Sequence, residues 1–164
     1  MNKEITLPAT FKKYLQPLNI MTYVLDDDKD MLEILEQIFK ENGFDQCNFF
    51  TEGKDFIEKL NENVHVCIVD HNLNNGVSGL EVARKARELN DECYIVAMTG
   101  THDPKVIIKY INECGVRYWV DKDKPRYMDE LAVYVKKIIP AIKSRFELMS
   151  FVLKGRNELK QWAH

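Results

Sequence analysis

Chemically reactive side chains follow four short apolar segments of this sequence, each near the point where the segment ends. An acidic triplet follows the first segment and single residues follow the other three: Asp26-Asp27-Asp28, Asp70, Thr99 and Lys122. If the segments are parallel strands of an open α/β sheet, their carboxyl ends meet at one crevice, where such sheets bind ligands. The sequence therefore predicts that carboxylates, a hydroxyl and an ammonium share one site.

The crowding of carboxylates predicts a bound cation. Three negative charges close together repel one another unless a cation joins them. A ligand set made only of oxygen atoms, with positions left open, suits Mg²⁺. A carboxylate beside such an ion is a candidate nucleophile towards phosphorus. The pattern therefore indicates phosphoryl transfer onto a carboxylate.

Segments of strand and helix character alternate after residue 19, which favours a parallel sheet covered by helices on both faces. Strands are predicted at 20–25, 45–50, 64–69, 93–98 and 117–120, and helices at 29–41, 52–61, 79–89, 104–113 and 126–139. Thr51, Ser78 and Asp103 precede three of the helices and are predicted to cap them. The chain thus contains five predicted βα units of the α/β class.

Helical extensions are predicted at both ends, which divides the chain into 1–19, 20–140 and 141–164. The first extension is a short helix around Phe11 and Tyr14. The last continues past Pro140, where we expect a kink, or a break and a new helix, because proline lacks a backbone donor.

The C-terminal extension carries a short apolar seam whose residues are spaced four, three and four apart: Ile142, Phe146, Met149 and Leu153. The seam docks onto the chain's own body, joins a second copy in a homodimer, or belongs to a linker. Trp162 is a further apolar anchor near the terminus.

Length and composition are those of an ordinary soluble globule. Residues 20–140 carry 15 Lys and Arg against 23 Asp and Glu. This acidic body argues against nucleic-acid binding, which needs a dense basic face. We expect neither a signal peptide nor a membrane span, and a cytoplasmic location. Four scattered cysteines without a CxxC pair are expected to be reduced and structural: Cys47, Cys67, Cys93 and Cys114.

Taken together, these residues resemble the receiver domain of two-component response regulators over about residues 20–140. The resemblance rests on an acidic pair after the first strand, a lone Asp ending the third, a Thr ending the fourth and a Lys after the fifth. It implies a doubly wound (βα)5 fold with five parallel strands in the flavodoxin-like order 2-1-3-4-5.

The resemblance also implies the reaction and its metal. Asp70 would accept a phosphoryl group from a histidine kinase or a histidine phosphotransfer protein. Asp26, Asp27 and Asp70, with the backbone carbonyl of Asn72, would bind Mg²⁺, or Mn²⁺ in its place. The protein would be a signalling receiver that catalyses its own phosphorylation and dephosphorylation, rather than an enzyme acting on other substrates.

A conformational switch is implied in the same way. Lys122 and Thr99 would contact the phosphoryl oxygens, and Thr99 would move inward on phosphorylation. The aromatic residue three before the lysine, Trp119, would follow it. The signal would leave the domain as this change of conformation or as a change in dimerisation.

Several residues depart from the family pattern. The loop from His71 to Gly79 carries one extra residue, and Asn74 stands where the family usually has Pro. Trp119 replaces a Tyr, Phe or His, so a static core aromatic is an alternative to a switch. Asp123 stands where many members have Pro. The loop change removes no catalytic group but is expected to affect donor recognition.

Two other functions compete with a phosphorylated receiver. The first is an interaction module that has the same fold and is never phosphorylated. An absence of Mg²⁺ binding would be evidence for this module. The second is a haloacid-dehalogenase-like phosphatase with Asp26 as nucleophile, since Asp28, Thr99 and Lys122 superficially match that family's order. That family places a further acidic motif after another strand, whereas a helix is predicted at 126–139 here.

Overall fold

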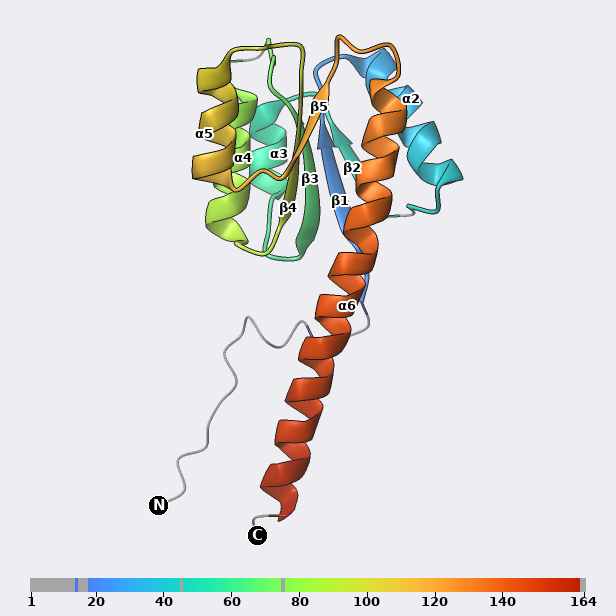
Figure 1. Cartoon of the computed structure of the whole chain (residues 1–164), viewed down its shortest axis with the longest axis vertical. Helices are drawn as coiled ribbons and strands as arrows, with labels where there is room; N and C mark the ends of the chain where they lie inside the picture. Colours follow the sequence, from blue (N-terminus) through green and yellow to red (C-terminus); the bar gives the residue numbers. More distant parts are fainter. Residues whose placement is uncertain (1–13, 15–17, 45, 75, 163–164) are drawn as a thin grey trace. The chain divides into compact units, whose positions relative to one another are not determined.

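The computed structural model of the chain describes residues 14, 18–44, 46–74 and 76–162, with side chains as far as residue 155 (Figure 1). Contacts divide the chain into two compact units. One is Ile20–Lys137. The other contains the residues from Ile138 onward together with the described residues of the N-terminal segment.

A parallel sheet forms the centre of the unit Ile20–Lys137. Its strands, within the described residues, are β1 (Met21–Leu25), β2 (Cys47–Phe50), β3 (Val64–Asp70), β4 (Tyr94–Thr99) and β5 (Tyr118–Asp121). Their order is β2-β1-β3-β4-β5, which confirms the predicted topology. Asp70 pairs with Met98, and Thr99 pairs with Asp121. This register brings the carboxyl ends of the central strands to one edge.

Helices cover both faces of this sheet. Those that the structure describes are α2 (Lys29–Glu41), α3 (Gly53–Lys59), α4 (Gly79–Leu89), α5 (Pro104–Cys114) and α6 (Tyr127–Trp162). Figure 1 shows α3, α4 and α5 on one face, and α2 with the first part of α6 on the other. Because helices lie on both faces, β3 is buried along most of its length, as its nearly continuous apolar sequence predicts.

The helix starts agree with the predicted caps in two cases of three. The Ser78 side chain accepts a hydrogen bond from the Glu81 backbone N–H, and the Asp103 side chain accepts one from Lys105. The structure differs at Thr51, because α3 begins at Gly53, one residue later than predicted, and the residue at its N-cap is Glu52, whose side chain makes no cap hydrogen bond. Two of the caps therefore fix the starts of α4 and α5, which follow the site strands β3 and β4.

The last helix is longer than predicted. A kink, or a break and a new helix, was predicted at Pro140, but α6 is one helix from Tyr127 to Trp162 with Pro140 inside it. Pro140 is exposed, so water can reach the backbone carbonyl that lacks its usual N–H donor. The prediction of a break is therefore wrong.

The second unit places Tyr14 against α6. Its ring centroid lies 5.4 Å from that of Phe146, and the Ser150 hydroxyl donates to the Tyr14 carbonyl. Ile142 and Leu153 are buried. The seam therefore contacts a residue of the chain's own N-terminal segment. The rest of the predicted N-terminal helix, and the Trp162 side chain, lie outside the described residues.

Two predictions from the sequence concern membrane-spanning helices and the state of the cysteines. Within the described part of the chain, no helix combines the length and the apolarity that crossing a bilayer requires. None of the four cysteines, all of which the structure describes, forms a disulfide, and three of them are buried: Cys67, Cys93 and Cys114.

Candidate functional site

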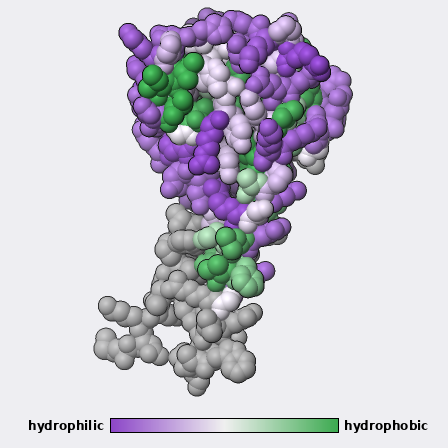
Figure 2. Space-filling model, in the orientation of Figure 1, coloured by the Kyte–Doolittle hydropathy of each residue, from purple (hydrophilic) through white to green (hydrophobic). Residues whose placement is uncertain are grey.

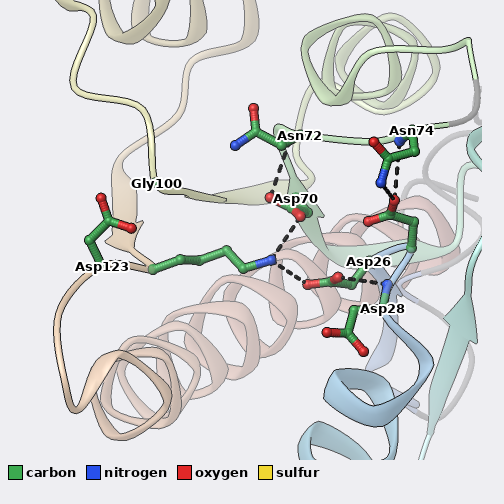
Figure 3. Close-up of a pocket in the computed structure, with 9 residues that line it drawn as sticks. Asp26, Asp28, Asp70, Asn72, Asn74, Gly100 and Asp123 are labelled. Atoms are coloured by element: carbon green, nitrogen blue, oxygen red, sulfur yellow. Dashed lines mark hydrogen bonds and ion pairs between the residues drawn. The ribbon is translucent and has the colours of Figure 1, made fainter.

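The carboxyl ends of β1, β3, β4 and β5 border one pocket (Figure 3). Residues from these ends and from the adjoining loops line it: Asp26, Asp27, Asp28, Asp70, Asn72, Asn74, Gly100, Lys122 and Asp123. All the candidate metal ligands are in this set, and so is the lysine. Thr99 is not among the described residues that line the pocket.

Three carboxylates of the pocket lie close enough to share one ion. Asp26, Asp27 and Asp70 each offer an oxygen atom, and these atoms lie within 4.8 Å of one another. Asp26 and Asp70 are buried, with relative exposures of 0% and 2%. The Asn72 backbone N–H donates to Asp70 Oδ1 over 3.3 Å. An all-oxygen donor set of this kind fits Mg²⁺ or Mn²⁺ and not a soft metal.

Lys122 bridges the two buried carboxylates. Its Nζ lies 3.0 Å from Asp26 Oδ2 and 2.8 Å from Asp70 Oδ2. Burial alone would lower the pKa of the ammonium, but the hydrogen bonds and charges of the two carboxylates outweigh it and raise the pKa. The Lys122 backbone N–H donates to the Thr99 carbonyl over 2.9 Å, which holds the lysine at the end of β4. The ammonium is therefore a fixed positive charge in the pocket.

Asp26 has a raised pKa. Burial raises the pKa because the charged form loses hydration, and the ammonium of Lys122 only partly offsets this. The nearby charge of Asp70 raises the pKa further, while a hydrogen bond of 3.1 Å from the Asp28 backbone N–H lowers it. The Asp28 side chain also caps α2, because it accepts hydrogen bonds from the backbone N–H groups of Asp30 and Met31. The most buried carboxylate of the pocket therefore holds its charge at a cost that a bound cation would relieve.

The third carboxylate, Asp27, is held by a neutral residue. Asn74 donates its backbone N–H to Asp27 Oδ2 over 3.1 Å, and its side-chain amide donates to the same oxygen. Sequence reasoning noted Asn74 at a position where the family usually has Pro, but gave it no role at the site. The presence of Asn in place of the usual Pro was the signal in the sequence that could have identified this role of Asn74.

Gly79 allows α4 to begin directly against the end of β3. A Cβ atom at this residue would lie 2.0 Å from the Asp70 backbone oxygen. The Gly79 N–H also donates to the His71 carbonyl over 3.4 Å. A residue with a side chain would displace the strand end that carries Asp70.

Thr99 lies at the end of β4 with its side chain buried. Its Oγ1 accepts a hydrogen bond of 2.9 Å from the Thr101 backbone N–H. The side chain is fully buried. This bond uses an acceptor lone pair of the hydroxyl and not its O–H, which can act as a donor.

An aromatic contact that the sequence did not predict links the loop after Asp70 to Trp119. His71 Nδ1 lies 3.2 Å from the Tyr110 hydroxyl, and the Tyr110 ring packs edge-on against Trp119 with centroids 5.5 Å apart. Tyr110 is fully buried. Burial lowers the pKa of His71, although the charge of Asp70 opposes this. The fold thus connects the residue after Asp70 to the predicted switch residue.

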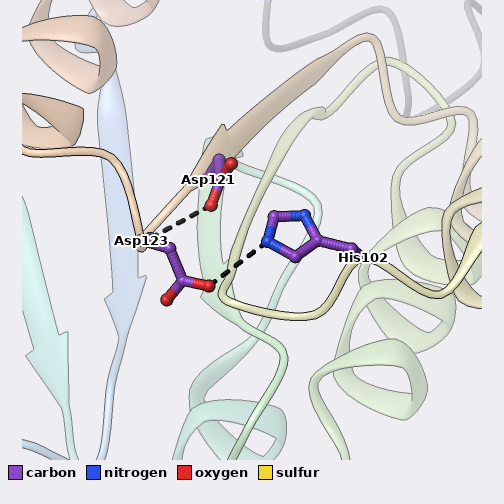
Figure 4. A group of neighbouring side chains, drawn as sticks. All are labelled: His102, Asp121 and Asp123. Carbon is purple, nitrogen blue, oxygen red and sulfur yellow. Dashed lines mark hydrogen bonds and ion pairs between the residues drawn. The ribbon is translucent and has the colours of Figure 1, made fainter.

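A second group of charged residues lies beside the pocket (Figure 4). His102 Nε2 is 3.3 Å from Asp123 Oδ2, and the Asp123 backbone N–H donates to Asp121 Oδ1 over 3.0 Å. A Cβ atom on Gly100 would lie 2.8 Å from Asp123 Oδ1, so the glycine leaves room for this carboxylate. These contacts join the loop after β4 to the loop after β5.

The element that follows Lys122 bears on the phosphatase alternative. After β5 the chain enters α6, and no sixth strand follows among the residues that the structure describes. The additional strand-borne acidic motif expected of a haloacid-dehalogenase-like phosphatase therefore has no strand to follow in this part of the chain.

Comparison with protein families gives one matching model over most of the chain. The model for the response regulator receiver domain matches residues 22–135. The response regulator protein TodT of Pseudomonas putida is 28% identical over 110 residues, which are 66% of this chain and 46% of TodT. A cyclic di-GMP phosphodiesterase of Thermotoga maritima is 30% identical over 99 residues, which are 60% of this chain and 26% of that protein. The chain thus spans about half the length of TodT and a smaller share of the length of the phosphodiesterase.

Solved structures of similar fold include a response regulator of Thermotoga maritima. DrrB has a TM-score of 0.64 and 27% identity, with 76% of this chain and 54% of DrrB covered. The DrrB receiver domain solved in a BeF3-activated form has a TM-score of 0.64 and 26% identity, with 75% of this chain and 99% of that domain covered. The similarity covers the unit that carries the pocket.

Proposed function

Because this chain belongs to the response regulator receiver domains of two-component systems, we propose that it accepts a phosphoryl group on the carboxylate of Asp70. The donor would be a histidine kinase or a histidine phosphotransfer protein. The observation that carries the proposal is the position of Asp70, whose carboxylate lies close to those of Asp26 and Asp27 and contacts the ammonium of Lys122. The matched family supports a signalling role for the domain.

In the proposed reaction, a carboxylate oxygen of Asp70 forms a bond to phosphorus while the bond between phosphorus and the donor imidazole nitrogen breaks. The imidazole leaves with the electron pair. The ammonium of Lys122, now shared between two carboxylates, would move to an oxygen of the transferred group.

The metal would be held by Asp26, Asp27, Asp70 and the backbone carbonyl of Asn72. When bound, Mg²⁺ neutralises charge on the transferring phosphoryl group and aligns donor and acceptor. The relative solved in a BeF3-activated form supports the phosphorylation step of the proposal, since beryllofluoride resembles a phosphoryl group on a carboxylate.

The test is intact-mass spectrometry after incubation with acetyl phosphate and Mg²⁺. We expect one phosphoryl adduct on the wild-type chain and on the control Asp91→Asn, an exposed carboxylate on a turn. We expect none on Asp70→Asn. An adduct on Asp70→Asn would refute Asp70 as the acceptor.

The competing functions give different results in companion assays. A wild-type chain with no adduct, no Mg²⁺ binding and no beryllofluoride binding would be an interaction module rather than a working receiver. Steady hydrolysis of a phosphomonoester, abolished by Asp26→Asn but not by Asp70→Asn, would favour the phosphatase.

We also propose that Thr99 and Trp119 transmit phosphorylation. Thr99 would turn its hydroxyl to the phosphoryl oxygens, and Trp119, half-buried against Tyr110, would change its surroundings. In a Trp162→Phe background, the fluorescence of Trp119 should shift when beryllofluoride and Mg²⁺ are added together. An unchanged emission spectrum alongside demonstrated beryllofluoride binding would make Trp119 a static aromatic.

A homodimer through residues 141–164 is a further part of the proposal. The described end of α6 exposes three large apolar side chains at helical spacing, with relative exposures of 61%, 77% and 50%: Leu148, Phe151 and Val152. Figure 2 shows hydrophobic surface on this part of the molecule. A helix that exposes such a stripe commonly packs against another protein surface.

Light scattering tests the homodimer. The wild-type chain should have the mass of two chains, and Phe151→Glu should have the mass of one. Lys143→Glu, an exposed charge reversal on the same helix, is the control. A monomeric wild type would instead favour docking of α6 onto the chain itself. Phosphorylation shifts the equilibrium only as far as the two states differ in dimer affinity.

A cytoplasmic location completes the proposal. Four cysteines without a disulfide among them fit a reducing compartment. Phosphorylation by a histidine kinase would take place in the same compartment. Thiol labelling of the chain in intact cells would test it, because a secreted chain would be labelled by a reagent that does not cross membranes.

A further inference from the structure

We infer that Asn74 is a positioning residue for the metal site, which holds the Asp27 carboxylate where it can bind Mg²⁺. The inference rests on the proposed function and adds a residue to it. It starts from the loop between β3 and α4, where Asn74 stands at the position that the receiver family usually gives to proline.

The three carboxylates of the site are held in two different ways. Asp26 and Asp70 share the ammonium of Lys122, at 3.0 and 2.8 Å. Asp27 instead receives two hydrogen bonds from Asn74, one from the backbone and one from the side chain. Asp27 and Asn74 are 47 positions apart in the sequence, so the two hydrogen bonds connect the loop after β3 to the end of β1 (Figure 3).

Asp27 needs such support more than its neighbours do. Its carboxylate oxygen lies within 4.8 Å of those of Asp26 and Asp70, whose negative charges repel it. Asp26 and Asp70 are buried and fixed by packing, whereas Asp27 is only partly buried. Without a hydrogen-bond donor, repulsion and side-chain entropy would both favour an Asp27 rotamer that points into solvent.

A neutral donor suits this role better than a cation would. The three carboxylates that can share an ion and the one ammonium leave two negative charges, and Asp28 and Asp123 in the same pocket add to them, so the site already attracts a divalent ion. A second lysine in place of Asn74 would compete with the metal for this charge. The two amide donors of Asn74 converge on Oδ2, which leaves Oδ1 as the oxygen that can bind an ion without breaking either bond. Hydrogen-bonded partners of this kind commonly orient metal-binding carboxylates and tune affinity.

A proline at this position would supply neither bond, because it has no backbone N–H and no side-chain donor. The series wild type, Asn74→Ala and Asn74→Pro therefore removes first one donor and then both. Asn74→Ala keeps the backbone N–H and the loop geometry, so it tests the side-chain amide alone. Asn112→Ala, at an exposed residue of α5, is the matched control.

The measurement is the Mg²⁺ dissociation constant of the full chain by calorimetric titration. We expect Asn74→Ala to weaken binding by roughly 10-fold, as loss of an orienting partner commonly does. Asn74→Pro should weaken binding further, and Asn112→Ala should match the wild type. A urea titration of each variant without metal checks that the folded state persists.

A double-mutant cycle with Asp27→Asn separates positioning from a general effect on the loop. If Asn74 acts through Asp27, Asn74→Ala should cause no further loss of Mg²⁺ affinity in the Asp27→Asn background. An equal loss in both backgrounds would overturn the inference. So would wild-type affinity in Asn74→Ala, and in that case the proposed function would still stand. A wild-type chain that binds no Mg²⁺ would overturn both.

Discussion

The substitution Lys122→Met removes the ammonium that bridges two buried carboxylates and keeps most of the length of the side chain. In the wild-type chain, Nζ lies 3.0 Å from Asp26 and 2.8 Å from Asp70. The Lys122 side chain is 22% exposed, and the two carboxylates are almost completely buried. Solvent therefore screens this interaction much less than it screens a surface ion pair.

The expected cost follows from this geometry. Removing one partner of a buried ion pair typically costs about 3–5 kcal/mol, because the remaining charge is left buried and unpaired. The pocket opens to solvent on one side, so we take the lower end, about 3 kcal/mol. Each kcal/mol shifts the melting temperature by about 2–4 °C in a domain of this size, so the variant should melt about 6–12 °C lower in the absence of metal.

The assay is urea unfolding in EDTA and again in saturating Mg²⁺. Lys124→Met is the matched control, because Lys124 is exposed and its Nζ lies 3.6 Å from Glu130. Lys124→Met should lower the free energy of unfolding by less than about 1 kcal/mol, as is usual for exposed ion pairs. Mg²⁺ should reduce the deficit of Lys122→Met, since a divalent ion replaces the missing positive charge beside Asp26 and Asp70.

Two results would refute the reasoning. One is a free energy of unfolding for Lys122→Met in EDTA that equals that of Lys124→Met, which would mean that the bridge contributes little to stability. The other is a large deficit that Mg²⁺ leaves unchanged, which would mean that Lys122 acts through packing of its stem rather than through its charge.

Two further predictions concern Gly79 and Cys114. Gly79→Ala places a Cβ 2.0 Å from the Asp70 backbone oxygen, so it should destabilise the fold by about 1–3 kcal/mol and slow phosphorylation, as measured by urea unfolding and intact mass. Its control, Gly155→Ala, meets nothing within 4 Å and should stabilise α6 by up to about 1 kcal/mol; equal effects of the two changes would contradict the packing argument. Burial raises the pKa of the Cys114 thiol from 9.0 to about 11, so above pH 9 the unfolded chain ionises first and the free energy of unfolding should fall as pH rises towards 11. Urea titrations from pH 7 to 11 should show a shallower fall for Cys114→Ala, and an identical slope would count against the shifted pKa.

Local patterns in the sequence were sufficient for most of the fold. The strands are short apolar runs between turn residues, and the caps Ser78 and Asp103 act on the backbone within three residues of themselves. The predicted start of the helix after Thr51 was one residue too early, because α3 begins at Gly53, after Glu52. At Pro140, the missing backbone donor predicted a kink or a break, and the break is wrong because the helix tolerates the lost hydrogen bond at an exposed position.

The sequence by itself also determined which residue types would meet at the pocket, since the carboxyl ends of parallel strands lie at one edge of the sheet. The tertiary structure decided how those residues pair. The bond from Asn74 to Asp27 spans 47 positions, that from His71 to Tyr110 spans 39, and Lys122 reaches Asp26 across 96. Such pairings depend on strand register, loop path and side-chain rotamers together, and no periodicity in the sequence records them.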